Sequence, residues 1–120
     1  NDKLILNKIY KISKKNKKIL VCLDSDHTHQ HVFDELKNYS KFVSKKSYLV
    51  VFDTTQGTFN KGDINKISKI YKYKPWGKKS NPLTAVKEFL KTNKNFVINQ
   101  NPYKKTLVSN CYSGFLKKIK

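Results

Sequence analysis

The fold is decided by the stretch Ile19-Leu20-Val21-Cys22-Leu23-Asp24-Ser25-Asp26-His27, in which an apolar run stops at two carboxylates and a histidine. A second run of the same kind, Tyr48-Leu49-Val50-Val51-Phe52-Asp53, follows later in the chain. Continuous apolar runs of this length predict strands that are buried on both faces, as in a parallel sheet. Because α/β sheets bind ligands outside the carboxyl ends of their strands, Asp24, His27 and Asp53 are expected at one place. Two carboxylates and an imidazole can hold a divalent metal or move a proton there.

The segments around these runs have the periodicity of an α/β domain. Residues 2–18 and 30–43 carry apolar side chains at helical spacing, and Asp2 is the expected N-cap of the first helix. The pair Asn81-Pro82 is a strong start signal for a third helix. Short strands are predicted over residues 96–99 and 106–112, joined by a hairpin loop over residues 100–105. The order of elements is therefore a βαβ unit, a helix and an antiparallel hairpin.

Residues 54–80 interrupt this pattern and predict a lid-like insertion within one domain that spans residues 1–120. Isoleucines at spacings of three predict a short helix over residues 64–70. The aromatic residues that follow are compatible with two roles, a surface that stacks on a sugar or a lid that packs against the sheet. These residues are Tyr71, Tyr73 and Trp76.

The composition argues against a dedicated nucleic-acid-binding protein despite the net charge of +18. All 26 basic residues are lysine, and the sequence has no arginine, whose planar fork recognises phosphate and guanine. Lys, Asn, Ile and Tyr all have AT-rich codons, so a biased genome accounts for the charge. No run approaches the length of about 20 apolar residues that a membrane span needs. Cys22 and Cys111 are expected to be small buried hydrophobes, and the cytoplasm is the expected compartment.

The strand ends and the later helix resemble the cephalosporin hydroxylase family, which includes rhamnosyl and macrolide-sugar O-methyltransferases. The likeness lies in Leu23-Asp24-Ser25-Asp26-His27-Thr28, followed by Tyr48-Leu49-Val50-Val51 and Asp53-Thr54. The helix from Asn81 to Leu90 and a closing strand over residues 110–117, with its glycine, are similar to the same family. The likeness covers most of residues 19–118.

This resemblance implies a Rossmann-like class I methyltransferase sheet of strand order 3-2-1-4-5-7-6. The chain would hold its C-terminal half, strands 4-5-7-6, with the last hairpin antiparallel. The glycine-rich turn that follows strand 1 is not in the sequence, and the chain begins at Asn1 directly before a helix. We therefore expect an incomplete fragment that is inactive alone, and we assign no cofactor-binding residue to it.

The implied activity is S-adenosylmethionine-dependent, metal-assisted O-methylation of a sugar or specialised-metabolite hydroxyl, with a hydroxylase role left open. By the resemblance, Asp24 and Asp53 would hold Mg²⁺, and His27 would be the catalytic base. The sequence departs from the family at Phe52, where a glutamate is common. As strand neighbours, Phe52 and Asp53 would point to opposite sides of the sheet, which leaves Phe52 a packing role. A homo-oligomer of the full-length protein is left open.

Other interpretations of the same residues stay open. Asp24 and Asp53 are also compatible with turn or capping roles at strand ends, and Asp26 is expected to cap or support the following loop rather than bind metal. His27 and His31 are four residues apart and could hold zinc on a helix face, although no soft ligand lies near them in sequence. The alternative function is a non-catalytic lysine-rich module that binds acidic glycan or nucleic acid.

Overall fold

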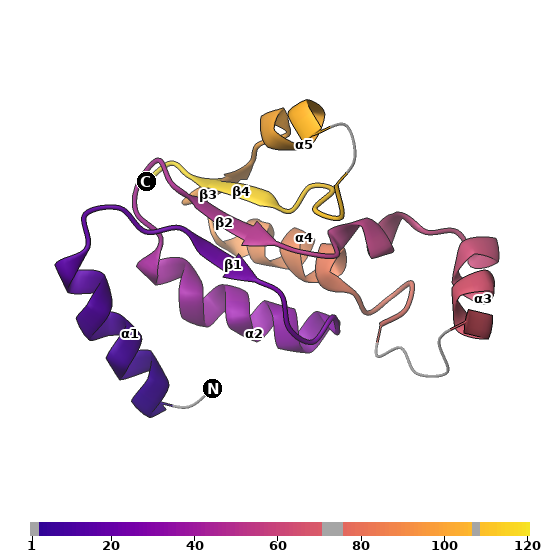
Figure 1. The fold of residues 1–120 in the computed structure, drawn as a ribbon, viewed down its shortest axis with the longest axis horizontal. Coiled ribbons are helices and arrows are strands. Elements are labelled where there is room, and N and C mark those ends of the chain that lie inside the picture. The colour runs from indigo at the N-terminus through magenta and orange to yellow at the C-terminus, as the bar shows by residue number, and fades with distance from the viewer. Residues whose placement is uncertain (1–2, 71–75, 107–108) are drawn as a thin grey trace.

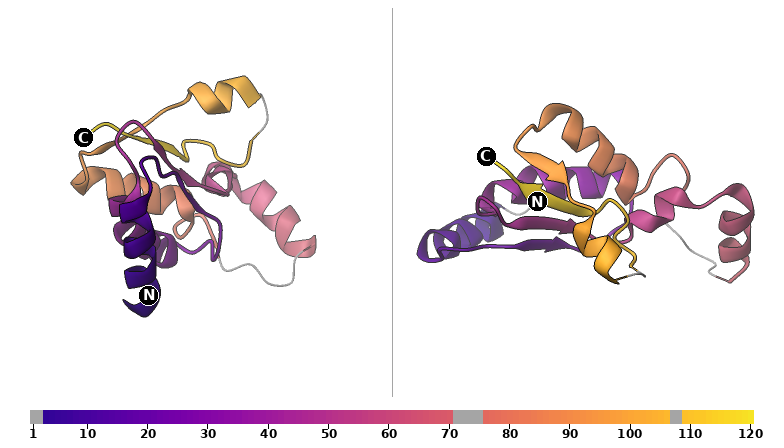
Figure 2. Two further views of the ribbon diagram at one scale, coloured as in Figure 1. Left: turned by 60° about the vertical axis from the view of Figure 1, so that its left-hand side comes forward. Right: turned by 90° about the horizontal axis from the view of Figure 1, so that it is seen from above.

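The computed structural model describes residues 3–70, 76–106 and 109–120, and it is an α/β structure built on a mixed sheet of four strands (Figure 1). Two helices lie side by side against one face of this sheet (Figure 2). The strands are β1 (Val21–Leu23), β2 (Tyr48–Val51), β3 (Phe96–Ile98) and β4 (Phe115–Lys118). The α-helices are α1 (Lys3–Lys15), α2 (His29–Tyr39), α3 (Lys61–Ile70), α4 (Pro82–Thr92) and α5 (Asn101–Thr106). The 3-10 turns are η1 (Ser40–Phe42) and η2 (Thr54–Thr58).

The strands follow the order β1-β2-β4-β3 across the sheet. β1 and β2 are parallel, with Leu23 opposite Val51, and helix α2 connects them. β4 lies antiparallel to both β2 and β3. The sheet is compatible with a methyltransferase-like fold, and its parallel pair brings the ends of β1 and β2 to the same edge.

The core lies between this sheet and helices α2 and α4. Val32 and Leu36, four residues apart, face the sheet from α2, and Val86 and Phe89 do the same from α4. They pack with the apolar side chains of β2 and β4, where Leu116 is fully buried. Burying a side chain of this size contributes about 1.5–3 kcal/mol, so the two helices are fixed firmly against the sheet.

The last predicted strand was wrong. Residues 101–106 form helix α5, the closing strand is β4 at Phe115–Lys118, and residues 107–108 lie outside the described part of the chain. The position of the strand was missed because β4 ends in two lysines, which are usually exposed. The side chain of Lys118 is nonetheless partly buried, and its Nζ donates to the Val43 carbonyl oxygen at 2.8 Å. The resemblance, which placed the closing strand around the glycine, was nearer to the observed position.

Other elements were confirmed or corrected. The short helix predicted over residues 64–70 lies within α3, and the helix that begins at Asn81-Pro82 is α4.

Cys22 is exposed on the edge strand β1, contrary to the prediction, whereas Cys111 is buried in a turn. The Asp2 cap, Tyr71 and Tyr73 lie outside the described residues, and Trp76 packs against the Phe59 ring.

Helices α1 and α3 project away from the sheet at two ends of the molecule (Figures 1 and 2). No residue of α1 is buried, and its apolar side chains Leu4 and Ile12 are 71% and 62% exposed. None of the described helices combines the length and the apolar character that crossing a membrane requires.

Candidate metal and acid–base site

The parallel pairing of β1 and β2 brings the two strand-end aspartates together. Leu23 and Val51 are partners in the sheet, and the ladder continues for one more bond, because the Phe52 N–H donates to the Leu23 carbonyl oxygen at 3.0 Å. Asp24 and Asp53 follow directly after this last pairing. Their carboxylates therefore occupy neighbouring positions at the edge of the sheet where α/β proteins bind ligands.

A sharp turn aims Asp53 at this edge. β2 ends at Val51, and Asp53 has a left-handed backbone with φ of 54° before the chain enters η2. Aspartate tolerates this conformation better than most residues do. The expected strand alternation of Phe52 and Asp53 therefore does not apply, because neither residue lies within the strand. Phe52 is half-buried, which agrees with a packing role.

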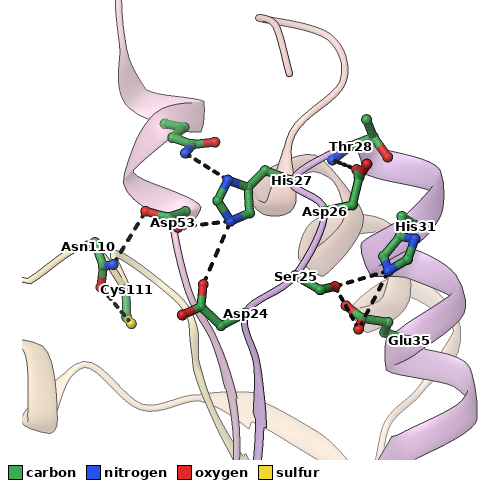
Figure 3. A network of polar contacts seen from close by, with 11 residues as sticks. Asp24, Ser25, Asp26, His27, Thr28, His31, Glu35, Asp53, Asn110 and Cys111 are labelled. Atoms are coloured by element: carbon green, nitrogen blue, oxygen red, sulfur yellow. Dashed lines mark hydrogen bonds and ion pairs between the residues drawn. The ribbon is translucent and has the colours of Figure 1, made fainter. Parts of the chain in front are cut away.

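The side chain of His27 lies between the two carboxylates (Figure 3). Its Nε2 is 3.0 Å from Asp53 Oδ2 and 3.7 Å from Asp24 Oδ1. One ligand atom from each of the three residues can be chosen so that all lie within 4.8 Å of one another. The side chain of Asp24 is 58% exposed, whereas those of His27 and Asp53 are 26% and 24% exposed. The cluster is therefore accessible to solvent mainly on the Asp24 side.

Two polar side chains that the sequence did not single out support this cluster. The Gln56 Nε2 donates to His27 Nδ1 at 3.3 Å, and the Asn110 Nδ2 donates to Asp53 Oδ1 at 3.3 Å. Cys111 continues the chain of contacts, since its Sγ donates to Asn110 Oδ1 at 3.2 Å. Burial raises the pKa of the Cys111 thiol, which keeps its proton available for this bond. The remaining polar atoms of His27 and Asp53, Nδ1 and Oδ1, thus each have a hydrogen-bond donor.

Asp26 supports the loop rather than the cluster. Its Oδ1 accepts a 2.7 Å bond from the Thr28 N–H at the entry to α2. Hydrogen bonds from the side chain and the backbone of Thr28 lower the pKa of the Asp26 carboxyl. This is the local bond by which short acidic side chains fix turns.

The structure does not bring His31 to His27. His31 Nε2 lies 3.0 Å from Ser25 Oγ and 3.6 Å from Glu35 Oε1, on the outer side of α2. His29 faces α4, where its Nε2 is 3.0 Å from Glu88 Oε2. Among the described residues, Asp24, His27 and Asp53 are the cluster whose ligand atoms could surround one ion, so the two-histidine zinc interpretation has no support.

A comparison with known families identifies the kind of protein to which this site belongs. The family model described as rhamnosyl O-methyltransferase/CmcI matches residues 1–119. No curated protein and no solved structure matches the chain. Nothing in these comparisons supports the alternative of a lysine-rich binding module. The match spans nearly the whole chain, and the chain belongs to the rhamnosyl O-methyltransferase/CmcI family of O-methyltransferase-like proteins.

Proposed function

We propose that the protein transfers a methyl group from S-adenosylmethionine to a hydroxyl of a sugar or specialised metabolite, with Asp24 and Asp53 holding a Mg²⁺ ion and His27 beside them as the base. The convergence of these three side chains at one sheet edge is the observation that carries the proposal. Membership of an O-methyltransferase-like family supports the reaction class.

The oxygen ligands of the cluster fit a hard cation. Opposite ligands of Mg²⁺ at bond lengths near 2.1 Å are about 4.2 Å apart, and one oxygen of Asp24 lies within 4.8 Å of one oxygen of Asp53. Asp24 and Asp53 would each supply one oxygen, while Asn110 holds the other oxygen of Asp53 in place. A bound Mg²⁺ lowers the pKa of a hydroxyl that it contacts. The exposed side of Asp24 leaves room for that hydroxyl.

His27 would act as the general base. Its Nε2 faces the cluster rather than solvent, and an imidazole accepts protons near neutral pH. The imidazolium that forms would be stabilised by the Asp53 carboxylate, which lies 3.0 Å from Nε2. The acceptor hydroxyl would lose its proton to Nε2 as its oxygen attacks the methyl carbon, and the sulfonium would leave as a neutral thioether.

Phe52 defines how this site differs from the family pattern. A glutamate at this position would add a third carboxylate, and phenylalanine offers no ligand. Mg²⁺ binding by this chain would therefore depend on the carboxylates of Asp24 and Asp53, and we expect a weaker site than one with three acids.

We further propose that the chain is the C-terminal half of the methyltransferase domain, with residues 54–80 as a lid-like insertion. The order β1-β2-β4-β3, with its antiparallel last pair, supports an equivalence with strands 4-5-7-6 of the methyltransferase sheet. The sequence contains no glycine-rich phosphate-binding or nucleotide-binding loop. Most contacts to S-adenosylmethionine would therefore come from outside these residues.

The proposal is tested by methyl transfer from labelled S-adenosylmethionine to a panel of deoxysugars and glycosylated metabolites, using the full natural protein. Removing a general base typically costs 10²–10⁴ in rate, so we expect His27→Asn to reduce turnover by about that factor. Asp24→Asn and Asp53→Asn should weaken Mg²⁺ binding in calorimetry and abolish turnover.

The matched control is Asp34→Asn, since Asp34 is a surface aspartate paired with Lys37 on α2. It should retain both Mg²⁺ binding and turnover. Unchanged Mg²⁺ binding and turnover in both Asp24→Asn and Asp53→Asn would contradict the proposal. Binding to acidic glycan with steep salt dependence and no effect of Asp24→Asn would point to a basic binding module instead.

A further inference from the structure

Of the two polar atoms in the side-chain amide of Gln56, one contacts the proposed base and the other has no hydrogen-bond partner among the described residues. Its Nε2 is 3.3 Å from His27 Nδ1, while its Oε1 is buried and has no hydrogen-bond partner among the described residues. A buried carbonyl oxygen without a partner costs about 1–3 kcal/mol. The side chain of Gln56 therefore lies beside His27 while its carbonyl oxygen makes no hydrogen bond within the described part of the chain.

This orientation of the amide selects one tautomer of His27. The Gln56 Nε2 is a donor, so the Nδ1 that it faces must carry a lone pair. The proton of the neutral ring is then on Nε2, where it points to Asp53 Oδ2 at 3.0 Å. This bond to a carboxylate stabilises the arrangement, but it leaves Nε2 unable to accept a proton or bind a cation.

The proposed function needs the other tautomer, because Nε2 is the ring nitrogen that faces both aspartates. With Nε2 unprotonated, Nδ1 carries the proton and requires an acceptor. Reversing the Gln56 amide by 180° about its last side-chain bond places Oε1 at the position now held by Nε2. The unpartnered oxygen then accepts from Nδ1, and the backbone does not move.

The backbone of Gln56 is held in place for this exchange. Its N–H donates to the Asp53 carbonyl oxygen at 3.0 Å within the turn into η2. The next residue, Gly57, lies so close to α4 that a Cβ there would meet Leu83 Cβ at 2.5 Å. The turn therefore packs tightly on α4, so the exchange would take place by rotation of the side-chain amide alone.

We propose that Gln56 is a positioning residue that sets the tautomer of His27 through the orientation of its side-chain amide, on the assumption that His27 Nε2 acts as proposed above. In the resting state the proton is on Nε2 and faces Asp53. When the Gln56 amide is reversed, its Oε1 accepts a hydrogen bond from the proton on Nδ1, and Nε2 is then able to accept a proton or bind a cation. The residue acts through His27 and does not touch the acceptor.

The test is ¹⁵N NMR of the full natural protein with labelled histidine, at a pH where the nitrogen shifts show a neutral ring. His27→Asn assigns the His27 signals by their loss. The wild-type protein without metal should show the Nε2–H tautomer. In Gln56→Glu the side chain can only accept, so the Nδ1–H tautomer should dominate. Gln30→Glu, on the exposed side of α2, is the matched control and should leave the His27 signals unchanged.

The second measurement uses Zn²⁺ alone as a diamagnetic probe of the cluster. Losing a residue that orients a metal ligand typically costs 10–100-fold in affinity, so Gln56→Leu should bind Zn²⁺ more weakly by about that factor. Gln56→Glu should bind at least as tightly as the wild type. A merely structural role would not distinguish these two substitutions.

The outcomes separate this inference from the proposed function. An Nδ1–H tautomer in the metal-free wild type, or the same tautomer in wild type and Gln56→Glu, overturns the role of Gln56 and leaves the methyltransferase proposal intact. The expected change of tautomer, together with full turnover in Asp24→Asn and Asp53→Asn, would support the role of Gln56 while contradicting the proposed metal site.

Discussion

Replacing the buried Asn81 by alanine should destabilise the fold strongly, although the change in side-chain volume is small. Asn81 is fully buried at the N-cap of α4. Its Oδ1 accepts from the Thr84 N–H at 3.1 Å, and its Nδ2 donates to the carbonyl oxygens of Gly77 and Lys78 at 2.8 and 3.2 Å. The Asn81 side chain thus caps the N-terminus of α4 and fixes the preceding loop at Gly77 and Lys78.

The magnitude for Asn81→Ala follows from these three bonds. Loss of an N-cap costs about 1 kcal/mol, within a range of roughly 0.5–2 kcal/mol. Each of the two donated bonds contributes about 1 kcal/mol, and the carbonyl oxygens that lose them are left without a donor. We therefore expect the free energy of unfolding to fall by about 3 kcal/mol.

The assay is urea unfolding of the full natural protein, followed by circular dichroism and by tryptophan fluorescence. The matched control is Asn60→Ala, because Asn60 also caps a helix, accepting from the Asp63 N–H at 2.9 Å, but lies on the surface. The control should lose no more than about 1 kcal/mol. Equal losses for Asn81→Ala and Asn60→Ala would refute the reasoning, since they would show that burial and the two extra bonds contribute nothing.

Three further predictions concern packing, pH and the sheet edge. Gly114→Ala should lower the melting temperature and turnover together, because its Cβ would lie 2.1 Å from the Val51 carbonyl oxygen at the end of β2; an unchanged melting curve would contradict this. Acidification should reduce the protection of the Thr28 amide against exchange, measured relative to its intrinsic rate at each pH, because the pKa of Asp26 is lowered in the folded state, so its contribution is present above the ordinary pKa and is lost as pH falls through the lowered value; the protection in an Asp26→Asn variant should not change with pH in this way. The 120-residue chain expressed alone should associate as salt screens its charge of +18, because β1 is an apolar edge strand with Leu20 beside it 54% exposed; a monomer in sedimentation at all salt concentrations would contradict this.

The parts of the fold that sequence could predict are those in which a local signal and the tertiary structure agree. The Asn81-Pro82 pair predicted the start of α4, and the structure shows a complete capping box there. The apolar run before Asp53 predicted β2, which is buried at Leu49, Val50 and Val51. The cap of α4 is a local interaction, and the apolar pattern of β2 matches its burial although its pairing partners lie far away in sequence.

The closing strand could not be predicted from its pattern, because its stability comes from partners distant in sequence. Lys117 and Lys118 are ordinary surface residues by type, yet they pair with Tyr48 and Phe96 of the neighbouring strands. The Nζ of Lys118 lies 5.8 Å from the centroid of the Phe96 ring, where the charge faces an aromatic side chain. A strand between two others is specified by both neighbours, and its own sequence need not be apolar throughout.

The candidate site divides along the same line. Asp24, His27 and Asp53 stood out because their side chains carry unmistakable chemistry at the ends of apolar runs. Gln56 and Asn110 did not, because amides are common in loops and only the fold shows what they contact. Asn110 reaches Asp53 across 57 residues of sequence. Residue type thus identifies the groups that can bind a cation or a proton, whereas the side chains that contact those groups become visible only when the loops are in place.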